Sequence, residues 1–473
     1  MASTDAPARA ATSWPDREIW PADPTHTSLA YRGIVRWGGT LVKTYYDVEL
    51  RGEAFPEDRP VLLVQNHTNG LCDALPLLSA SRRPIRILVK YKLMTTPLIG
   101  WMLRRLEAVP LYRRKDGVDT RKNAEAFRAI DEALAARSVI ALFPEGESLD
   151  AIGLRELKSG VARMAISAEE AAGGDLGLVV VPIGVTHEDR DRFRTRISSV
   201  VGPPIEVGEV LRGAGDADAR ERVTALMGSI EAGLRALILH ADDPEQFHAA
   251  VALERVSARD GAPLGLRRKA ARAALVADAE RDPDGAPARR EAIRQLGDAL
   301  DAGRLSGDDV LGDAPAAASL ALRFAALVPG TLLGVVTHGL PSLAAVQISK
   351  LRRTPDKLVT LRVVPGSVLY ALWGALLVGL GAWRVGALGA ALALLAVAAL
   401  VPLWPRVVDG LLAVRRGVLL RALARRGDEL ETLRSNVRAI REALPLQVES
   451  ERGETLGAES PRADSEREAE RGG

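Results

Sequence analysis

The chain has 473 residues and a formal net charge of +2, and 47% of its residues are hydrophobic. A charge so close to zero argues against a general nucleic-acid-binding protein, because such proteins are usually strongly basic. The single cysteine, Cys72, excludes an internal disulfide and fits a reducing compartment. A chain of this length is expected to form roughly two to four domains.

Both ends of the chain are predicted to be disordered. Residues 1–24 are rich in Ala, Pro, Asp and Arg and lack the apolar core of a signal peptide. Residues 449–473 are rich in Glu, Arg, Gly and Ser and offer hardly any apolar side chains for a core. We therefore expect an N-terminal arm and a C-terminal tail without stable structure.

Residues 29–46 are predicted to form an amphipathic helix. Aromatic and aliphatic side chains recur there at helical spacing, and Arg32, Arg36 and Lys43 lie on other faces. The helix either packs on the protein as an ordinary surface helix or lies in a membrane interface. The apolar segments near the C-terminus favour the second interpretation.

The region 25–214 is predicted to be one α/β domain that includes this helix. From about residue 56 to residue 207, short apolar runs alternate with helical patterns, which is typical of such domains. The runs 61–64 and 178–181 are apolar throughout, as expected of strands covered on both faces. The candidate strands are 61–64, 85–89, 108–112, 139–143 and 178–185, and the candidate helices are 98–106, 123–136 and 160–171.

Residues 215–318 are predicted to form a solvated helical region. They are rich in Ala, Arg, Asp, Glu and Leu, and prolines 263, 283 and 287 interrupt the helical pattern. His240 and His248 have no metal-ligand partners at a useful spacing, so we expect both to be surface or helix-face residues. We expect no chemistry in this region, and a further helix at residues 426–448.

Residues 319–425 are predicted to be a membrane region with a transmembrane hairpin at 366–404. Residues 366–383 and 385–404 contain no charged side chain, and each run is near the length that spans a hydrocarbon core of about 30 Å. Arg384 lies at the tip. Basic residues precede and follow the hairpin, which places both flanks on the cytoplasmic side. The alternative is a pair of buried core helices, although such helices seldom run so long without a charge.

A further apolar stretch at residues 324–346 contains Pro329, Thr337, His338 and Pro341. It is either a third, kinked span or an interfacial element, and the sequence leaves both interpretations open.

The first candidate for chemistry is the segment 66–73, which reads Asn-His-Thr-Asn-Gly-Leu-Cys-Asp and follows the buried run 61–64. The unperturbed pKa of histidine, about 6.5, suits a general base. Asp73 could bond one ring nitrogen of His67 and so fix its tautomer, as in catalytic triads. The sequence has no Gly-x-Ser-x-Gly motif, so the proton should come from a substrate hydroxyl. A purely structural histidine is the alternative.

Cationic side chains form a second candidate. Arg113, Arg114 and Lys115 follow the predicted strand 108–112 and suggest binding of an anion such as a phosphate. Lys158 adds a cation just before a predicted helix, and helix N-termini favour anions. The alternative for the three consecutive cations is a solvated basic turn.

A third candidate is Glu145, which stands between Pro144 and Gly146 at the end of a predicted strand. A glutamate held in such a turn could bind hydroxyl groups of a polyol substrate. The alternative is a solvated turn residue. No cluster of side chains has metal-ligand spacing, so no metal is expected.

Taken together and in this order, these segments resemble the motif blocks of the glycerolipid acyltransferase family. These enzymes transfer a fatty acyl group from a thioester to glycerol 3-phosphate or a lysophospholipid. The histidine–aspartate block is 66–73, the arginine block 110–113, the Phe-Pro-Glu-Gly block 143–146, and the late apolar block with proline 180–183. The resemblance covers about residues 30–210 and implies a mixed sheet flanked by helices.

The spacing of the first block is informative. Five residues separate His67 from Asp73, one more than in most of the family. This spacing resembles the subgroup that contains fungal glycerol-3-phosphate/dihydroxyacetone-phosphate acyltransferases and bacterial relatives. Two positions depart from the usual pattern. Glu107 stands where a glycine is frequent, and Glu147-Ser148 replaces a frequent Thr-Arg, which removes one phosphate-binding cation.

The resemblance implies a mechanism. His67, oriented by Asp73, removes a proton from an acceptor hydroxyl, and the alkoxide attacks the thioester of acyl-CoA or acyl carrier protein without a covalent enzyme intermediate. Arg113 and Lys158 would hold the phosphate, and Glu145 and Gly146 would shape the glycerol site. No cofactor is needed. An acyl-cysteine at Cys72 is disfavoured, because a free cysteine is usually a small packing residue.

The expected setting is the cell inner membrane, with several spans and a cytoplasmic catalytic domain. The expected partners are membrane lipids, the acyl donor and a phosphorylated glycerol-type acceptor, with no nucleic acid. Two alternatives remain open: an enzyme of the same chemistry that acts on 1-acylglycerol 3-phosphate or another lysophospholipid, and a non-catalytic membrane scaffold on the same fold.

Overall fold

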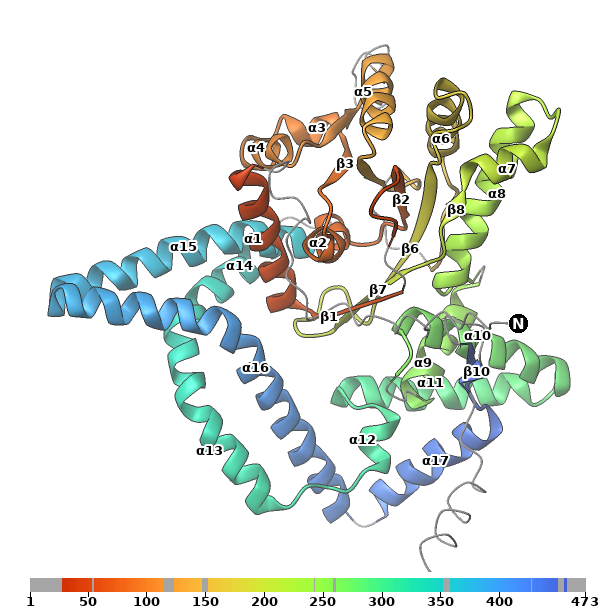
Figure 1. Cartoon of the computed structure of the whole chain (residues 1–473). Coiled ribbons are helices and arrows are strands. Elements are labelled where there is room, and N and C mark those ends of the chain that lie inside the picture. The colour runs from red at the N-terminus through yellow and green to blue at the C-terminus, as the bar shows by residue number, and fades with distance from the viewer. Residues whose placement is uncertain are drawn as a thin grey trace, which may run out of the picture. The chain divides into compact units, whose positions relative to one another are not determined.

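The structure is a computed structural model, and it describes residues 28–52, 55–113, 123–146, 152–241, 243–257, 261–351, 358–426, 428–449 and 455–456 (Figure 1). The predicted arm, Arg114, Lys115, the pair Glu147-Ser148 and most of the predicted tail lie outside these residues. The chain divides into two compact units. The first comprises 1–237 and 332–405, and the second comprises 238–331 and 406–473.

The first unit contains an eight-stranded sheet in the order β1-β7-β6-β2-β5-β3-β4, with β8 beside β6. Strand β6 pairs antiparallel with β7 and β8, and the other neighbours are parallel, so the sheet is mixed. The expected α/β fold with a mixed sheet is therefore confirmed. The strands are β1 (Asp47–Gly52), β2 (Val61–Gln65), β3 (Ile85–Lys90), β4 (Val109–Leu111), β5 (Val139–Leu142), β6 (Val179–His187), β7 (Arg196–Val201) and β8 (Ile205–Glu206).

Helices cover both faces of this sheet (Figure 1). On one face, side chains of α1 and α2 join a core with alternate residues of the central strands, such as Val61 and Leu63. The intervening residue, Leu62, is also fully buried, because α5, α6 and α8 cover the other face. The helices are α1 (Leu29–Tyr45), α2 (Leu71–Ala80), α3 (Tyr91–Met94), α4 (Pro97–Arg105), α5 (Asn123–Ala135), α6 (Gly160–Ala171), α7 (Val207–Ala214) and α8 (Ala219–Leu237).

Helix α1 corrects the preferred interpretation of the first amphipathic segment. Its apolar face is buried in the first unit, where Val42 joins the core and Tyr31 packs against Met102 and Leu106 of the α4 region. The Tyr31 hydroxyl also accepts a hydrogen bond from the backbone N–H of Ile85. The apolar face is thus used for packing, and α1 is an ordinary packing helix on that side.

Helix α8 moves the expected domain boundary. Residues 215–237 were predicted to belong to the helical region, but α8 packs on β6 and α6 of the first unit. Its side chains Leu226, Ile230 and Leu234 are fully buried. The helical composition of this region was recognised in the sequence, but composition does not say which partner buries a given helix.

The second unit is helical, as predicted, but it has an apolar core of its own. Leu253, Leu275 and Ile293 are buried in one cluster, and Val256, Leu300 and Val437 in another. The short strands β9 (Val448–Glu449) and β10 (Thr455–Leu456) pair antiparallel, where a disordered tail was expected. The helices of this unit include α9 (Pro244–Ser257), α10 (Leu264–Arg281), α11 (Ala286–Gly303), α12 (Gly307–Leu311) and α17 (Glu429–Ala443).

Within the part of the chain that the structure describes, two helices are long and apolar enough to cross a membrane. One is the stretch Ala317–Ser349, built from α13 (Ala317–Gly334), the π-helical turn η5 (Val335–Gly339) and the first part of α14 (Leu340–Leu351), and the other is Pro365–Val385 of α15 (Leu358–Val385). A third candidate is the pair Ala387–Ala399 and Val401–Arg425 within α16 (Ala387–Arg425), which bends by 55°. Residues 324–346, for which the sequence left a kinked span and an interfacial element open, therefore belong to one long helix that contains a π-helical turn.

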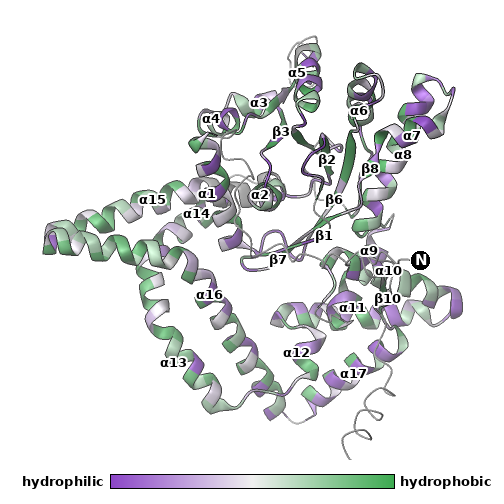
Figure 2. Cartoon of the chain, in the orientation of Figure 1, coloured by the Kyte–Doolittle hydropathy of each residue, from purple (hydrophilic) through white to green (hydrophobic). Residues whose placement is uncertain are grey.

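The hairpin of α15 and α16 turns at Gly386, whose φ of +69° suits glycine. The two helices approach closely, since a Cβ on Gly381 would lie 2.5 Å from the carbonyl oxygen of Gly389. Figure 2 shows mostly hydrophobic residues along α15. Their side chains are largely exposed, including Leu372 and Trp383. This exposure argues against core helices of a soluble protein and favours contact with lipid.

Candidate active site

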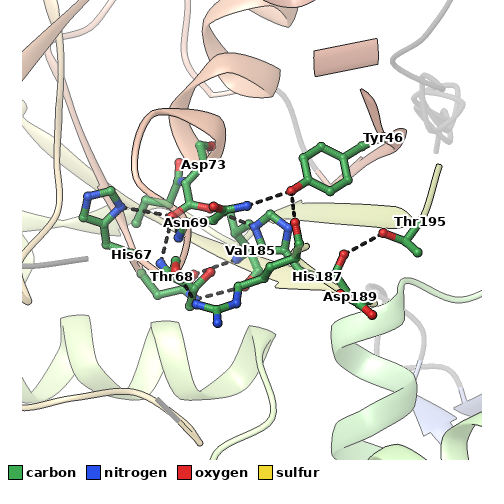
Figure 3. A network of polar contacts seen from close by, with 12 residues as sticks. Tyr46, His67, Thr68, Asn69, Asp73, Val185, His187, Asp189 and Thr195 are labelled. Atoms are coloured by element: carbon green, nitrogen blue, oxygen red, sulfur yellow. Dashed lines mark hydrogen bonds and ion pairs between the residues drawn. The ribbon is translucent and has the colours of Figure 1, made fainter. Parts of the chain in front are cut away.

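His67 and Asp73 form a hydrogen-bonded pair where β2 ends and α2 begins (Figure 3). Strand β2 is entirely buried, and the chain leaves the core at the C-terminal end of this strand. Gly70, with a φ of +52°, then directs the chain into α2. Asp73 lies in the first turn of that helix, and its Oδ2 is 3.0 Å from His67 Nδ1. The predicted contact between these two residues is present.

The carboxylate of Asp73 is fully buried and accepts several hydrogen bonds. Its Oδ2 also accepts the backbone N–H groups of Thr68, at 2.8 Å, and Asn69, at 2.6 Å. Its Oδ1 lies 2.8 Å from His187 Nε2. Burial acts to raise the pKa of Asp73, but the hydrogen bonds and charge of His187 and His67 outweigh it and hold the pKa well below its usual range. Asp73 is therefore held as a carboxylate beside the His67 ring.

His187 is a site residue that the sequence analysis missed. It lies at the C-terminal end of β6, and its side chain is buried against Tyr46, with ring centroids 5.5 Å apart. Strand β6 runs parallel to β2, so the two strands end at the same edge of the sheet. A histidine directly after a buried strand was the available signal, the same one that identified His67.

The ring of His67 is held from a second side by the turn that follows β5. It stacks on Phe143, with centroids 3.9 Å apart and an interplanar angle of 22°. Glu145 Oε1 accepts a 3.0 Å hydrogen bond from the backbone N–H of His67. Burial raises the pKa of Glu145, and the hydrogen bond from His67 acts in the opposite direction. One carboxylate oxygen of Glu145 therefore holds the backbone of His67. The sequence had suggested only that Glu145 binds substrate hydroxyl groups.

The two predicted cations reach the same turn. Arg113 Nη1 donates a 3.1 Å hydrogen bond to the carbonyl oxygen of Gly146, and the backbone N–H of Lys158 donates to the carbonyl oxygen of Pro144 at 2.8 Å. The side chain of Lys158 is 65% exposed. The turn at residues 143–146 thus gathers the predicted site residues from the ends of β2, β4 and β5. A substrate anion bound by Arg113 and Lys158 would lie near this turn.

Cys72 is buried on α2, and burial raises the pKa of its thiol. A nucleophilic cysteine needs an accessible thiolate, and this environment disfavours one. Among the residues that the structure describes, no group of His, Cys, Asp and Glu side chains could hold a metal ion. The arrangement as a whole offers one partly exposed imidazole beside a buried carboxylate. Arg113 is bonded to the adjacent turn, and the Lys158 ammonium lies 3.9 Å from Glu156.

Residues 47–186 match the family model described as Acyltransferase. Over 125 residues, the chain is 34% identical to glycerol-3-phosphate O-acyltransferase 2 of Saccharomyces cerevisiae, covering 26% of this chain and 16% of that protein. Over 149 residues, it is 28% identical to the chloroplastic 1-acyl-sn-glycerol-3-phosphate acyltransferase LPAT1 of Arabidopsis thaliana, covering 31% and 38%. The chain therefore spans well under half the length of these relatives.

Among solved structures, the crystal structure of the 1-acyl-sn-glycerophosphate acyltransferase PlsC from Thermotoga maritima is similar to this chain. The match covers 44% of this chain and 81% of that one, at 19% sequence identity and a TM-score of 0.32.

Proposed function

We propose that residues 47–186, which match the Acyltransferase family model, are a glycerolipid acyltransferase domain, and that the protein transfers a fatty acyl group to glycerol 3-phosphate or dihydroxyacetone phosphate. The acyl donor in this proposal is acyl-CoA or acyl carrier protein. The observation that carries the proposal is the His67 Nδ1 to Asp73 Oδ2 contact, which leaves Nε2 as the basic nitrogen of a neutral imidazole.

The proposed reaction is a direct acyl transfer. His67 Nε2 takes the proton of an acceptor hydroxyl while that oxygen attacks the thioester carbonyl. The C–O bond forms, the C–S bond breaks, and the proton passes from His67 to the departing thiolate. The ionised Asp73 stabilises the imidazolium that exists between these two proton transfers.

The acceptor's phosphate is proposed to bind Arg113 and Lys158, which flank the turn that carries Glu145. A guanidinium can bond two phosphate oxygens at once, so Arg113 would fix the orientation of the acceptor. Holding one hydroxyl beside His67 is expected to supply much of the rate enhancement.

A membrane location suits this reaction, because the acylated product partitions into a bilayer. The apolar helices Ala317–Ser349 and Pro365–Val385 would anchor the protein. We propose the cell inner membrane, with the catalytic domain on its cytoplasmic face and a multi-pass anchor. Basic flanks of the hairpin could attract anionic lipids, at about 1 kcal/mol per cation near the surface.

The similarity to the Arabidopsis protein favours a second candidate acceptor, 1-acylglycerol 3-phosphate, which offers the same phosphate group. The test is CoA release by the purified full-length protein in lipid vesicles, with glycerol 3-phosphate, dihydroxyacetone phosphate and lysophosphatidate compared as acceptors. The proposal predicts release with one of the first two. Release with lysophosphatidate alone supports the second candidate, and no transfer from acyl-CoA or acyl carrier protein to any acceptor supports a non-catalytic scaffold.

A further inference from the structure

Asp73 is shared between two histidines, one on each carboxylate oxygen (Figure 3). Oδ2 faces His67 Nδ1 at 3.0 Å, and Oδ1 faces His187 Nε2 at 2.8 Å. His187 comes from a different strand, 114 residues further along the chain. The base and its orienter are thus tied to the centre of the sheet as well as to their own loop.

The charge state of Asp73 fixes the role of each imidazole nitrogen. An ionised carboxylate has acceptors only, so both nitrogens that face it must carry a proton. Nε2 of His187, which faces Oδ1, is therefore an N–H donor, and so is Nδ1 of His67. This assignment leaves Nε2 of His67 as the nitrogen that can take a proton from a substrate.

The two carboxylate oxygens depend on different parts of the chain. Oδ2 receives hydrogen bonds from His67, Thr68 and Asn69, all within the loop that follows β2. Oδ1 receives its hydrogen bond from His187 on β6. Asp73 is fully buried, so water cannot take over that bond if the histidine is removed.

His187 is itself held in place. It pairs with Ile197 in the β6–β7 ladder, its ring lies edge-on to Tyr46, and its side chain is only 3% exposed. This burial keeps it away from the solvent-accessible side, where His67 is partly exposed. His187 therefore acts on the reaction through Asp73.

We propose that His187 is a positioning residue: its Nε2–H anchors Oδ1 of Asp73, so that Oδ2 stays aligned on Nδ1 of His67 during acyl transfer. The inference rests on the proposed function, because it concerns the same base. It predicts that the N–H donor, rather than the imidazole ring as such, is what position 187 must supply.

The test compares His187→Gln, whose side-chain amide can supply an N–H group, with His187→Phe, which fills the space without a donor. The control is Thr186→Val, one residue earlier on β6, because successive side chains of a strand point to opposite faces of the sheet. His187→Phe should lower kcat by about 10- to 100-fold, the usual effect of removing a group that orients a site residue. The KM for the acceptor should stay within about twofold, since His187 does not touch the substrate. His187→Gln should recover most of the lost rate.

A second measurement covers the case in which His187→Phe folds poorly. In the Asp73→Asn background, wild-type histidine and His187→Leu, a second variant without a donor, should give the same residual kcat, because the bond to the ionised carboxylate is already absent. The inference is overturned if His187→Phe keeps the wild-type kcat, if Phe and Gln lower it equally, or if the histidine still matters in the Asp73→Asn background. Absence of transfer by the wild type would instead overturn the proposed function.

Discussion

Glu145 and His67 are joined by a 3.0 Å hydrogen bond, in which the backbone N–H of His67 donates to Oε1 of the glutamate. The bond connects the turn after β5 to the loop after β2, and the Phe143 ring stacks on the imidazole beside it. Burial disfavours the ionised form of a carboxyl group when its hydrogen bonds do not make up for the lost contact with water. This is the reason that burial raises the pKa of Glu145.

The raised pKa of Glu145 gives a pH-dependent prediction for Glu145→Gln. A carboxyl whose pKa is higher in the folded state than in the unfolded state lowers stability once the pH exceeds the unfolded value, about 4.3. Glutamine removes that charge and still offers a carbonyl oxygen to the His67 N–H. The variant should therefore have a higher Tm than the wild type at pH 7, and the difference should shrink as the pH falls toward 4.

Thermal unfolding of both proteins at pH 7 and pH 4 checks this prediction. Glu156→Gln is the matched control, because the Glu156 side chain is 89% exposed and should show little change at either pH. A Glu145→Gln variant that is less stable than the wild type at pH 7, with a loss that shrinks toward pH 4, would show that the carboxylate is needed as an anion and would contradict the prediction.

Tyr46 ties the end of α1 to the active-site loop. Its hydroxyl accepts a 2.8 Å hydrogen bond from Asn69 Nδ2 and donates to the carbonyl oxygen of Arg190. Tyr46→Phe leaves the buried Asn69 amide without this acceptor, which should cost about 1–3 kcal/mol. For a unit of this size, each kcal/mol lowers Tm by roughly 2–4 °C.

The neighbouring Tyr45→Phe is the comparison. The Tyr45 hydroxyl donates to the carbonyl oxygen of Asp191 and accepts from Arg362 Nη1, and because its bond to Asp191 is exposed, its loss should cost less. Differential scanning calorimetry of the two variants measures the difference. Equal losses, or a larger loss for Tyr45→Phe, would mean that the Asn69 contact is not a main support of the loop.

Arg113→Gln should raise the KM for a phosphorylated acceptor by about 10- to 100-fold, since hydrogen bonds to charged groups contribute about 1.5–3 kcal/mol. The kcat should change less, because Arg113 takes no part in the proton transfer of the proposed reaction. Steady-state kinetics with varied acceptor concentration measures both constants. Arg128→Gln, on the exposed side of α5, is the control. An unchanged KM would remove Arg113 from the phosphate site.

Arg362 gives a prediction about membrane topology. It lies just before the apolar stretch Pro365–Val385, and its Nη1 donates to the Tyr45 hydroxyl at 3.0 Å and to the carbonyl oxygen of Asp191 at 2.7 Å. We therefore predict that the start of α15 lies on the same side of the membrane as the catalytic domain. On this prediction, Ala317–Ser349 anchors the chain without carrying it across, and Arg384 lies on the opposite side.

Cysteine labelling in intact cells checks this topology in a Cys72→Ala background. Arg384→Cys should react with a membrane-impermeant maleimide, while Asp175→Cys, on an exposed loop of the catalytic domain, should react only after permeabilisation. Protection of Arg384→Cys until permeabilisation would mean that Ala317–Ser349 crosses the membrane. The same background also tests Cys72, since loss of activity in Cys72→Ala would reopen an acyl-cysteine.

The central strands could be predicted from the sequence, because β2, β5 and β6 are buried apolar runs and β3 is apolar at four of its six positions. The edge strand β1 was missed, since it carries Glu49 and Arg51 and is only partly covered. Helix α2 was also missed. It contains Pro76 and is apolar on nearly all sides, so it shows no amphipathic periodicity.

The predicted site residues meet at one place because parallel strands end at the same edge of a sheet. His187 was overlooked for a related reason. Its partner Asp73 is 114 residues away, and β6 extends beyond its pairing with β2 by four residues that no local pattern specifies. The contact between two such residues is a property of sheet register, which a single sequence does not encode in any short motif.

The most direct test of the account is the rate of CoA release by wild-type protein and His67→Ala, measured side by side with acyl-CoA and glycerol 3-phosphate in lipid vesicles. The far-UV circular dichroism and Tm of the two proteins serve as the folding control. The account predicts transfer by the wild type and only the buffer rate for a folded His67→Ala. Turnover by His67→Ala at the wild-type rate would contradict it.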